Sequence, residues 1–125
     1  MRKRVLVADD EPMTAELLAL VLAFNGYEVV QAHDGREALE RARAVRPDVV
    51  LLDVMMPRLA GPDVARRLRS DPELADVPVV LFSCVDESDV DWRGAGADLF
   101  LQKPVDIRAL PDVVRRLTGR CDRAV

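Results

Sequence analysis

The sequence predicts an α/β domain in which a doubly wound, five-stranded parallel sheet is covered by helices on both faces. Short apolar runs of strand length alternate with longer segments whose apolar residues recur at helical spacing. Several of the short runs are continuously apolar, which is typical of strands buried between two layers of helices. A chain of 125 residues is long enough for one such domain with its own core, and we expect no second, output domain within it.

The central strand is predicted at Val49–Leu52, because four large apolar residues run directly into Asp53. Asp53 therefore stands at the carboxyl end of a buried strand. In open α/β sheets, ligands bind in the crevice outside the strand carboxyl ends, so Asp53 is a candidate reactive group. An ordinary loop carboxylate is the alternative, and this stretch alone does not dismiss it.

The first strand is predicted at Val5–Ala8, and it also ends in acidic residues, Asp9 and Asp10. Pro12 is a residue type favoured in the first turn of a helix, so a helix is predicted to begin there. The helical spacing predicts that this helix turns the following apolar residues inward: Met13, Leu17, Leu20, Val21 and Phe24.

The middle of the chain continues the alternation of strands and helices. Tyr27–Ala32 alternates weakly, as a strand near the sheet edge does, and the helix that follows ends before Pro47. Another helix begins at Pro62, and a fourth strand, Val77–Phe82, leads into Ser83. The inward residues of these two helices are predicted to be Ala38, Leu39, Ala42 and Val45, and then Val64, Ala65 and Leu68.

The last part of the chain contains the weakest helical signal. Val85–Gly96 is acidic at first and glycine-rich later, so we expect a short, frayed or displaced helix there. A fifth strand, Leu99–Leu101, precedes a last helix that Asp106 can cap and in which Pro111 would remove a backbone donor. The apolar side of the last helix is predicted to be Leu110, Val113, Val114 and Leu117.

The charge and the cysteines argue against several classes of protein. The net charge of −4 opposes general nucleic-acid binding, and the arginines of 66–69 and 115–116 are interpreted as solvated helix faces. Cys84 and Cys121 share no metal-type spacing, and we expect a core thiol and an exposed thiol without a disulfide. The apolar run after Arg4 is too short for export or membrane spanning, so we expect a cytoplasmic protein without membrane contact.

Polar groups follow four of the predicted strands: Asp9 and Asp10 the first, Asp53 the third, Ser83 the fourth and Lys103 the fifth. Because the carboxyl ends of parallel strands lie on one edge of a sheet, these side chains are expected to gather there. Three carboxylates and one ammonium sum to −2 and repel one another unless protons or a divalent cation bind. Mg²⁺ prefers oxygen ligands, so the sequence predicts a magnesium site at Asp10 and Asp53, with Asp9 behind them.

With these residues in place, the chain resembles the receiver domains of two-component response regulators over nearly its whole length. The resemblance consists of Asp9-Asp10, the run Leu51–Pro57 around Asp53, Gly61 eight residues after Asp53, Ser83 thirty after it, and Phe100 three before Lys103-Pro104. The motifs are specific jointly, not singly. The resemblance implies a flavodoxin-like sheet of strand order 2-1-3-4-5 with five helices, the fourth short or irregular, and a single receiver domain over residues 1–125.

The resemblance also implies that Asp53 accepts a phosphoryl group from a sensor histidine kinase, a phosphotransfer protein or a small donor such as acetyl phosphate. Asp53 would be the nucleophile, Mg²⁺ would neutralise charge, and Lys103 and Ser83 would donate to the phosphoryl oxygens. By analogy, the backbone carbonyl of Met55 would complete the magnesium shell. Ser83 and Phe100 resemble the family's switch pair, in which the hydroxyl moves toward the phosphoryl group and the ring turns inward.

A signalling role follows from the same resemblance. The chain would catalyse its own phosphorylation and dephosphorylation, turn over no external substrate, and contact an unknown downstream protein or a second copy of itself. A cis peptide is implied at Lys103-Pro104, in a tight turn that aims the ammonium at the site. Two departures from the family pattern, the slightly short segment between Ser83 and Lys103 and the position of Pro111, are expected to alter the customary dimerisation or output contacts.

Three alternatives compete with this interpretation. An aspartate-nucleophile phosphatase needs a second carboxylate two residues after its nucleophile, where Met55 stands. A dinucleotide-binding domain needs a glycine-rich turn after Val5–Ala8, and none follows. The remaining alternative is a receiver-like adaptor that binds partners without phosphorylation, whereas the intact Asp10, Asp53 and Lys103 favour a phosphoacceptor.

Overall fold

A computed structural model of the chain describes residues 2–123, with side chains as far as residue 119. Its parallel sheet contains β1 (Arg4–Ala8), β2 (Glu28–Ala32), β3 (Val49–Asp53), β4 (Val79–Ser83) and β5 (Leu99–Gln102). The strands lie in the order β2-β1-β3-β4-β5, which confirms the expected order. The register sets Asp53 beside Phe82 and Ser83 beside Gln102, so the polar residues reach the same edge of the sheet.

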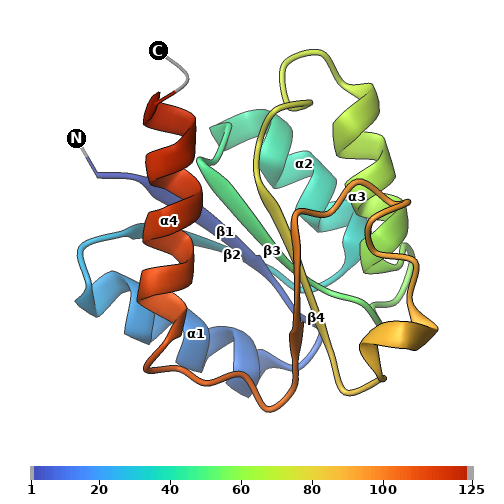
Figure 1. Ribbon diagram of the computed structural model, residues 1–125, viewed down its shortest axis with the longest axis horizontal. Coiled ribbons are helices and arrows are strands. Elements are labelled where there is room, and N and C mark those ends of the chain that lie inside the picture. The colour runs from blue at the N-terminus through green and yellow to red at the C-terminus, as the bar shows by residue number, and fades with distance from the viewer. Residues whose placement is uncertain (1, 124–125) are drawn as a thin grey trace.

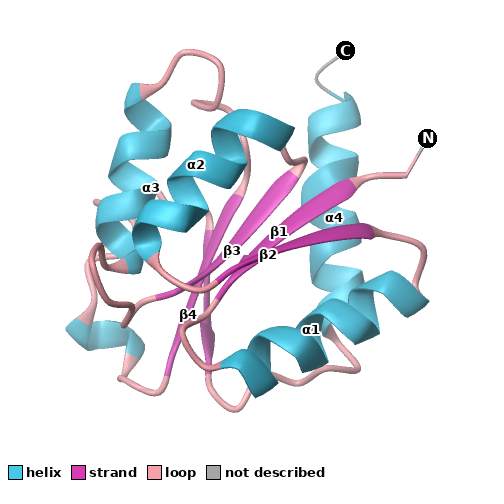
Figure 2. Cartoon of the chain, turned by 180° about the vertical axis from the view of Figure 1, so that it is seen from behind, coloured by secondary structure: helices cyan, strands magenta, loops and turns pink. Residues whose placement is uncertain are grey.

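Helices cover both faces of the sheet (Figure 1, Figure 2). They are α1 (Pro12–Phe24), α2 (Gly35–Val45), α3 (Gly61–Ser70) and α4 (Leu110–Arg123), with one 3₁₀ turn, η1 (Glu87–Asp89). Helices α2 and α3 pack on one face, and α1 and α4 pack on the other. Five helices were expected, but residues 2–123 contain four α-helices, because the fourth predicted helix is reduced to η1. Within the same residues, no helix has both the length and the apolar character needed to cross a membrane.

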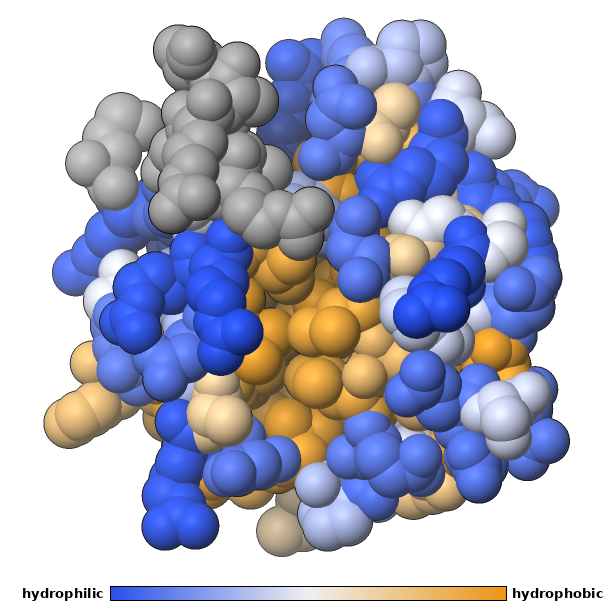
Figure 3. Space-filling view, in the orientation of Figure 1, coloured by the Kyte–Doolittle hydropathy of each residue, from blue (hydrophilic) through white to orange (hydrophobic). Residues whose placement is uncertain are grey.

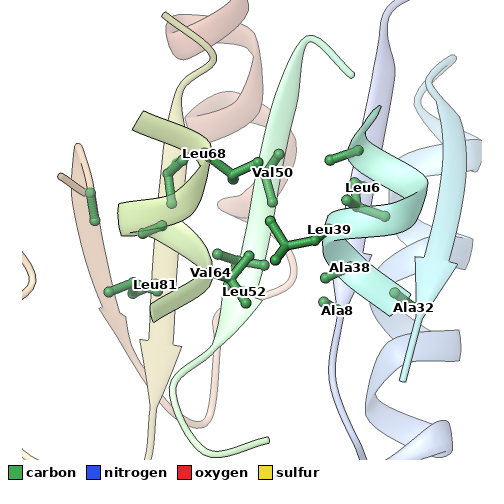
Figure 4. Close-up of a cluster of buried hydrophobic side chains, with 14 of the residues drawn as sticks. Leu6, Ala8, Ala32, Ala38, Leu39, Val50, Leu52, Val64, Leu68 and Leu81 are labelled. Carbon is green, nitrogen blue, oxygen red and sulfur yellow. The ribbon is translucent and has the colours of Figure 1, made fainter. Parts of the chain in front are cut away.

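The core between the sheet and helices α2 and α3 follows the sequence pattern closely. Leu39 of α2 and Val64 and Leu68 of α3 lie over Val50 and Leu52 of the central strand (Figure 4). Strand β3 is buried along its whole length, as its continuous apolar run predicts. Every predicted inward residue of these two helices is buried except Val45, which is half-buried.

Helix α1 contacts the sheet with a different side from the one predicted. Its buried residues are Ala15, Leu18, Ala19 and Leu22. Of the residues predicted to face inward, Val21 is half-buried, and those exposed are Met13 (82%), Leu17 (47%), Leu20 (58%) and Phe24 (92%). The prediction was wrong because α1 is apolar almost all round, so helical spacing alone does not single out one inner side. The side that packs carries two small alanines, which let the helix approach the sheet closely.

The core under helices α1 and α4 is incompletely covered near strand β5. Figure 3 shows hydrophobic atoms gathered at the surface between α4 and β5, the orange strand of Figure 1. The partly buried apolar residues of this region that pack against the core are Leu99, Leu101, Val105, Ile107 and Val113. Of the four residues predicted on the inner side of α4, Leu110, Val114 and Leu117 are buried and Val113 is half-buried.

Pro111 lies just within helix α4, as predicted, but the backbone donor that it lacks is not one the helix uses. The helix begins at Leu110, so Pro111 lies in its first turn. Backbone N–H groups of a first turn have no partner within the helix, so proline removes no hydrogen bond there. Just before the helix, the Asp106 carboxylate accepts the N–H of Arg108 at 3.0 Å, which is the turn that leads the chain into α4.

The segment between β4 and β5 forms a single 3₁₀ turn and confirms the expected short, displaced helix. The Asp86 carboxylate caps η1 by accepting the N–H of Ser88 at 3.2 Å. The far end is held by Arg69 of α3, which donates to the Gly96 carbonyl and to the Asp98 carboxylate, each at 2.8 Å. This arginine connects the end of the segment to α3.

The cysteines follow the prediction only in part. Cys84, predicted to be a core thiol, is exposed, because it comes after Ser83 and beyond the end of β4. The prediction for Cys121 concerns a side chain that lies outside the described residues.

Candidate active site

The carboxyl edge of the sheet holds an ammonium between two buried carboxylates. The Nζ of Lys103 lies 3.2 Å from a carboxylate oxygen of Asp9 and 3.4 Å from one of Asp53. Asp9 directly follows β1 and Asp53 ends β3, and these strands are neighbours in the sheet. Lys103 follows β5, and its bond to Pro104 is cis, as expected.

Three carboxylates converge at this edge, as the sequence predicts. Asp9, Asp10 and Asp53 each place one oxygen within 4.8 Å of the others. Asp9 and Asp53 are buried, whereas Asp10 is exposed and makes no hydrogen bond or ion pair with any described residue. Hard divalent cations with a preference for oxygen, Mg²⁺ above all, suit such a donor set, and one ammonium does not balance three carboxylates. The residues present therefore fit a magnesium ion.

The pKa values of Asp53 and Lys103 reflect this shortage of positive charge. Burial and the neighbouring Asp9 carboxylate raise the pKa of Asp53 to about 6, although Lys103 and the Met55 N–H act to lower it. Burial also acts to lower the pKa of Lys103, but the attraction of Asp53 and Asp9 outweighs it and raises that pKa. At neutral pH the ammonium is charged, and Asp53 is an ionised carboxylate that a further cation would stabilise.

Ser83, at the end of β4, and Phe100, in β5, are the two residues predicted to form a switch pair. Ser83 follows Phe82, the register partner of Asp53, and its hydroxyl oxygen accepts the N–H of Val85 at 3.0 Å. No acceptor among the described residues binds the proton of that hydroxyl, so the proton is available to an incoming group. The ring of Phe100 is already inward, since the residue is only 6% exposed and belongs to the α2/α3 core.

The loop after β3 supplies backbone groups to the site. The Met55 N–H donates to the Asp53 carboxylate at 3.3 Å, while no described residue donates to the Met55 carbonyl oxygen. Gly61 returns the chain to this loop, donating its N–H to the Val54 carbonyl at 3.0 Å. A Cβ at position 61 would lie 2.4 Å from the Asp53 carbonyl oxygen, so a side chain there would displace the backbone that carries Asp53.

Two features of the site were not found from the sequence. The Lys103 ammonium lies 5.2 Å from the centre of the Phe82 ring, a cation–π arrangement that the position of Phe82 beside Ser83 at the strand end could have suggested. A groove of about 390 Å³ also opens beside Lys103, between α1 and the chain after β5. Its mainly apolar lining includes Leu17, Leu18, Cys84, Pro104, Val105 and Ile107. No local pattern predicts a groove whose walls come from three distant segments.

The strand order and this edge define a class of protein, a doubly wound α/β domain with an acidic, lysine-bearing site at the carboxyl ends of its strands. The family model described as "Response regulator receiver domain" matches residues 5–115. The chain belongs to this family, the receiver domains of two-component signalling.

Individual relatives agree with the family assignment. The response regulator MprA of Mycobacterium ulcerans is 44% identical over 122 residues, which are 96% of this chain and 52% of that protein. The receiver domain of a signal transduction histidine kinase from Syntrophus aciditrophicus is 34% identical with a TM-score of 0.89, over 97% of this chain and 93% of that one. A receiver domain of a sensor histidine kinase from Pseudomonas aeruginosa, solved with a magnesium ion in its active site cleft, is 25% identical with a TM-score of 0.86, over 95% and 99%. The chain spans about half the length of the curated relatives it matches.

Proposed function

We propose that this chain takes a phosphoryl group onto Asp53 in the presence of Mg²⁺ and then changes its partner-binding surface. The donor would be a sensor histidine kinase, a phosphotransfer protein or a small acyl phosphate. The observation that carries the proposal is the Lys103 ammonium, held 3.4 Å from the Asp53 carboxylate and 3.2 Å from Asp9. This ammonium stands where negative charge would accumulate on a transferred phosphoryl group.

In the proposed transfer, a carboxylate oxygen of Asp53 attacks the phosphorus of the donor. A new P–O bond forms as the bond to the leaving nitrogen or oxygen breaks, and the leaving group keeps the electron pair. Lys103 and the free hydroxyl proton of Ser83 donate to the phosphoryl oxygens. Because transfer of this kind depends chiefly on positioning and charge, no separate general base is needed.

Mg²⁺ would be held by Asp10 and Asp53 with the Met55 carbonyl, and Asp9 would lie behind them. When bound, the ion would neutralise charge on the phosphoryl oxygens. The exposed Asp10 carboxylate and the Met55 carbonyl support this assignment, since neither has a partner among the described residues. The magnesium ion in the cleft of the related Pseudomonas aeruginosa domain supports it further.

The donor protein is proposed to dock on helix α1. Its outward residues Met13, Leu17, Leu20 and Phe24 are exposed, and large apolar side chains gathered on one helix mark an interaction surface more often than a solvated one. Leu17 also lines the groove that reaches Lys103. An amphipathic helix of the partner laid against α1 would bring its phosphohistidine to the edge that holds Asp53.

The test is incubation with acetyl phosphate and Mg²⁺, followed by measurement of the intact mass. The wild-type chain is expected to gain the mass of one phosphoryl group. No gain is expected in Asp53→Asn, or in the wild-type chain when the metal is chelated. A gain that persists in Asp53→Asn, or none with any donor, would contradict the proposal. The second result would favour an adaptor that binds partners without phosphorylation.

A further inference from the structure

One side-chain amide holds the backbone that leaves strand β4. The Nε2 of Gln102 donates to three consecutive carbonyl oxygens, those of Ser83 at 3.2 Å, Cys84 at 2.9 Å and Val85 at 3.0 Å. The same Ser83 carbonyl accepts the backbone N–H of Lys103 at 2.8 Å. Residues 102 and 103 therefore both bind the Ser83 carbonyl oxygen, and Gln102 also binds the next two carbonyl oxygens.

The reason for this contact is the end of the sheet. Beyond Ser83 the chain no longer pairs with β5, so the carbonyl groups that a strand would bond are left to side chains or water. The Gln102 amide has only two protons for three acceptors, so one proton must be shared. Three carbonyls that turn toward one amide fix the path of residues 83–85 more tightly than a single hydrogen bond would.

This segment carries one of the two groups proposed to bind the phosphoryl oxygens. Ser83 is the hydroxyl donor on β4, and Lys103 is the ammonium donor after β5. Both must reach oxygens of the same phosphoryl group, and donors act best when they are already in place. Gln102 is the immediate neighbour of Lys103 and holds the backbone of Ser83, so it couples the positions of the two donors.

We propose that Gln102 is a positioning residue for phosphoryl transfer, acting through Ser83 and Lys103 without touching the phosphoryl group. The inference rests on the proposed function of Asp53. Removing a direct donor from such a site slows catalysis by roughly 10²–10³-fold. For a residue that only holds two donors in register, we expect a smaller loss, roughly 3–10-fold in the affinity for a phosphoryl mimic and in the phosphorylation rate.

Two substitutions separate hydrogen bonding from charge. Gln102→Met keeps a similar length and removes both N–H donors, whereas Gln102→Glu keeps the shape and sets a carboxylate against three carbonyls. The matched control is Gln31→Met, at the only other glutamine in the sequence. Gln31 lies on strand β2, and its amide lies 3.4 Å from a carboxylate oxygen of Glu16, so its loss should leave the site unchanged.

Four quantities are measured for each chain. They are the affinity for Mg²⁺ alone, the affinity for Mg²⁺ with beryllofluoride, the rate of phosphorylation by acetyl phosphate, and the rate of hydrogen exchange of the Val85 N–H. Both Gln102 variants should keep the Mg²⁺ affinity, since no proposed ligand has changed. Both should bind beryllofluoride and react with acetyl phosphate 3–10-fold less well. The Val85 N–H, which donates to the Ser83 hydroxyl, should exchange faster.

Each other outcome decides against the inference. An unchanged beryllofluoride affinity and rate in Gln102→Met would overturn it, as would a loss in Gln102→Glu alone, which would reveal a charge effect. An equal loss of affinity for Mg²⁺ and for the mimic would mean general disruption of the site. A wild-type chain that binds no mimic and gains no phosphoryl group would instead overturn the proposed function, and a positioning role in transfer with it.

Discussion

Lys103 and Asp53 are in contact across the end of strand β4, which contains neither residue. Their charged groups lie 3.4 Å apart, although Asp53 ends β3, Lys103 follows β5, and β4 lies between. The lysine reaches over the end of β4, where the Phe82 ring lies 5.2 Å from its ammonium. The Lys103 ammonium thus pairs with Asp9 and Asp53, which stand at the ends of two other strands. Because these groups are packed together by the fold, its stability depends on their charges.

The first prediction is that Asp53→Asn stabilises the metal-free protein near pH 7.5. Folding raises the pKa of Asp53 from 3.8 to about 6, so the folded state holds the proton more tightly than the unfolded state. The stability that the proton provides is complete below about pH 4 and is lost as the pH rises through about 6. The variant should therefore gain on the order of 1–3 kcal/mol at pH 7.5 and little near pH 4.

Urea unfolding in the presence of a chelator measures this, with Asp76→Asn as an exposed control. A variant no more stable than wild type at pH 7.5 would show that burial of the Asp53 charge does not strain the fold.

A second prediction concerns Asp10. Mg²⁺ should raise the unfolding temperature of the wild-type chain, because a ligand at a hundred times its dissociation constant adds about 2.7 kcal/mol. In Asp10→Asn this rise should be largely lost, while the metal-free stability should not fall, since the Asp10 carboxylate has no partner among the described residues. Thermal unfolding over a magnesium series decides the matter. An equal rise in both chains would remove Asp10 from the site.

The third prediction is a slow loss of the phosphoryl group. The positions two residues after Asp53 and two after Ser83 are Met55 and Val85, and neither side chain can orient an attacking water. The double variant Met55→Asn, Val85→Glu should therefore lose the phosphoryl group faster, by roughly 10-fold or more. Decay of the phosphorylated mass after removal of the donor gives the rate. Identical decay in the two proteins would show that these positions do not control hydrolysis.

The fourth prediction uses the only tryptophan in the sequence. Trp92 is half-buried against the α2/α3 core, and the Arg93 guanidinium lies 4.6 Å from its ring centre. Its segment joins β4, which ends in Ser83, to β5, which contains Phe100, so a shift of the switch pair would reach it. Fluorescence of Trp92 should change when Mg²⁺ and beryllofluoride are added together, and not in Asp53→Asn. A silent Trp92 in a chain that binds the mimic would show that the segment does not move.

The sequence was sufficient where an element is either apolar throughout and short, like a buried strand, or polar on one side only, like a surface helix. Val49–Leu52 is apolar throughout and ends in Asp53, so both the central strand and the place of the carboxylate could be predicted. Helices α2 and α3 carry charged residues on one side, and their buried sides were predicted almost completely. Helix α1 has no such contrast, so its orientation depends on how closely its alanines approach the sheet.

Other features depend on where an element ends, which local patterns predict poorly. Cys84 stands just past the last residue of β4, and Pro111 just past the first residue of α4. In each case a shift of one or two residues decides whether the side chain is buried or whether a backbone donor is lost. The role of Gln102 needs two segments at once, since its acceptors lie 17 to 19 residues away.

The thirteen residues of helix α1 form two sides with different roles, an inner side that packs on the sheet and an outer side that is exposed. The inner residues pack in the core, whereas Leu20 and Phe24 on the outer side are 58% and 92% exposed. Outer residues are therefore free to change without unfolding the chain. If the donor docks on α1 as proposed, two chains with the same core and the same acidic edge would differ in their donors through this helix alone. Under that proposal, substitutions on the outer side of α1 would change the donor while leaving the residues around Asp53 unaltered.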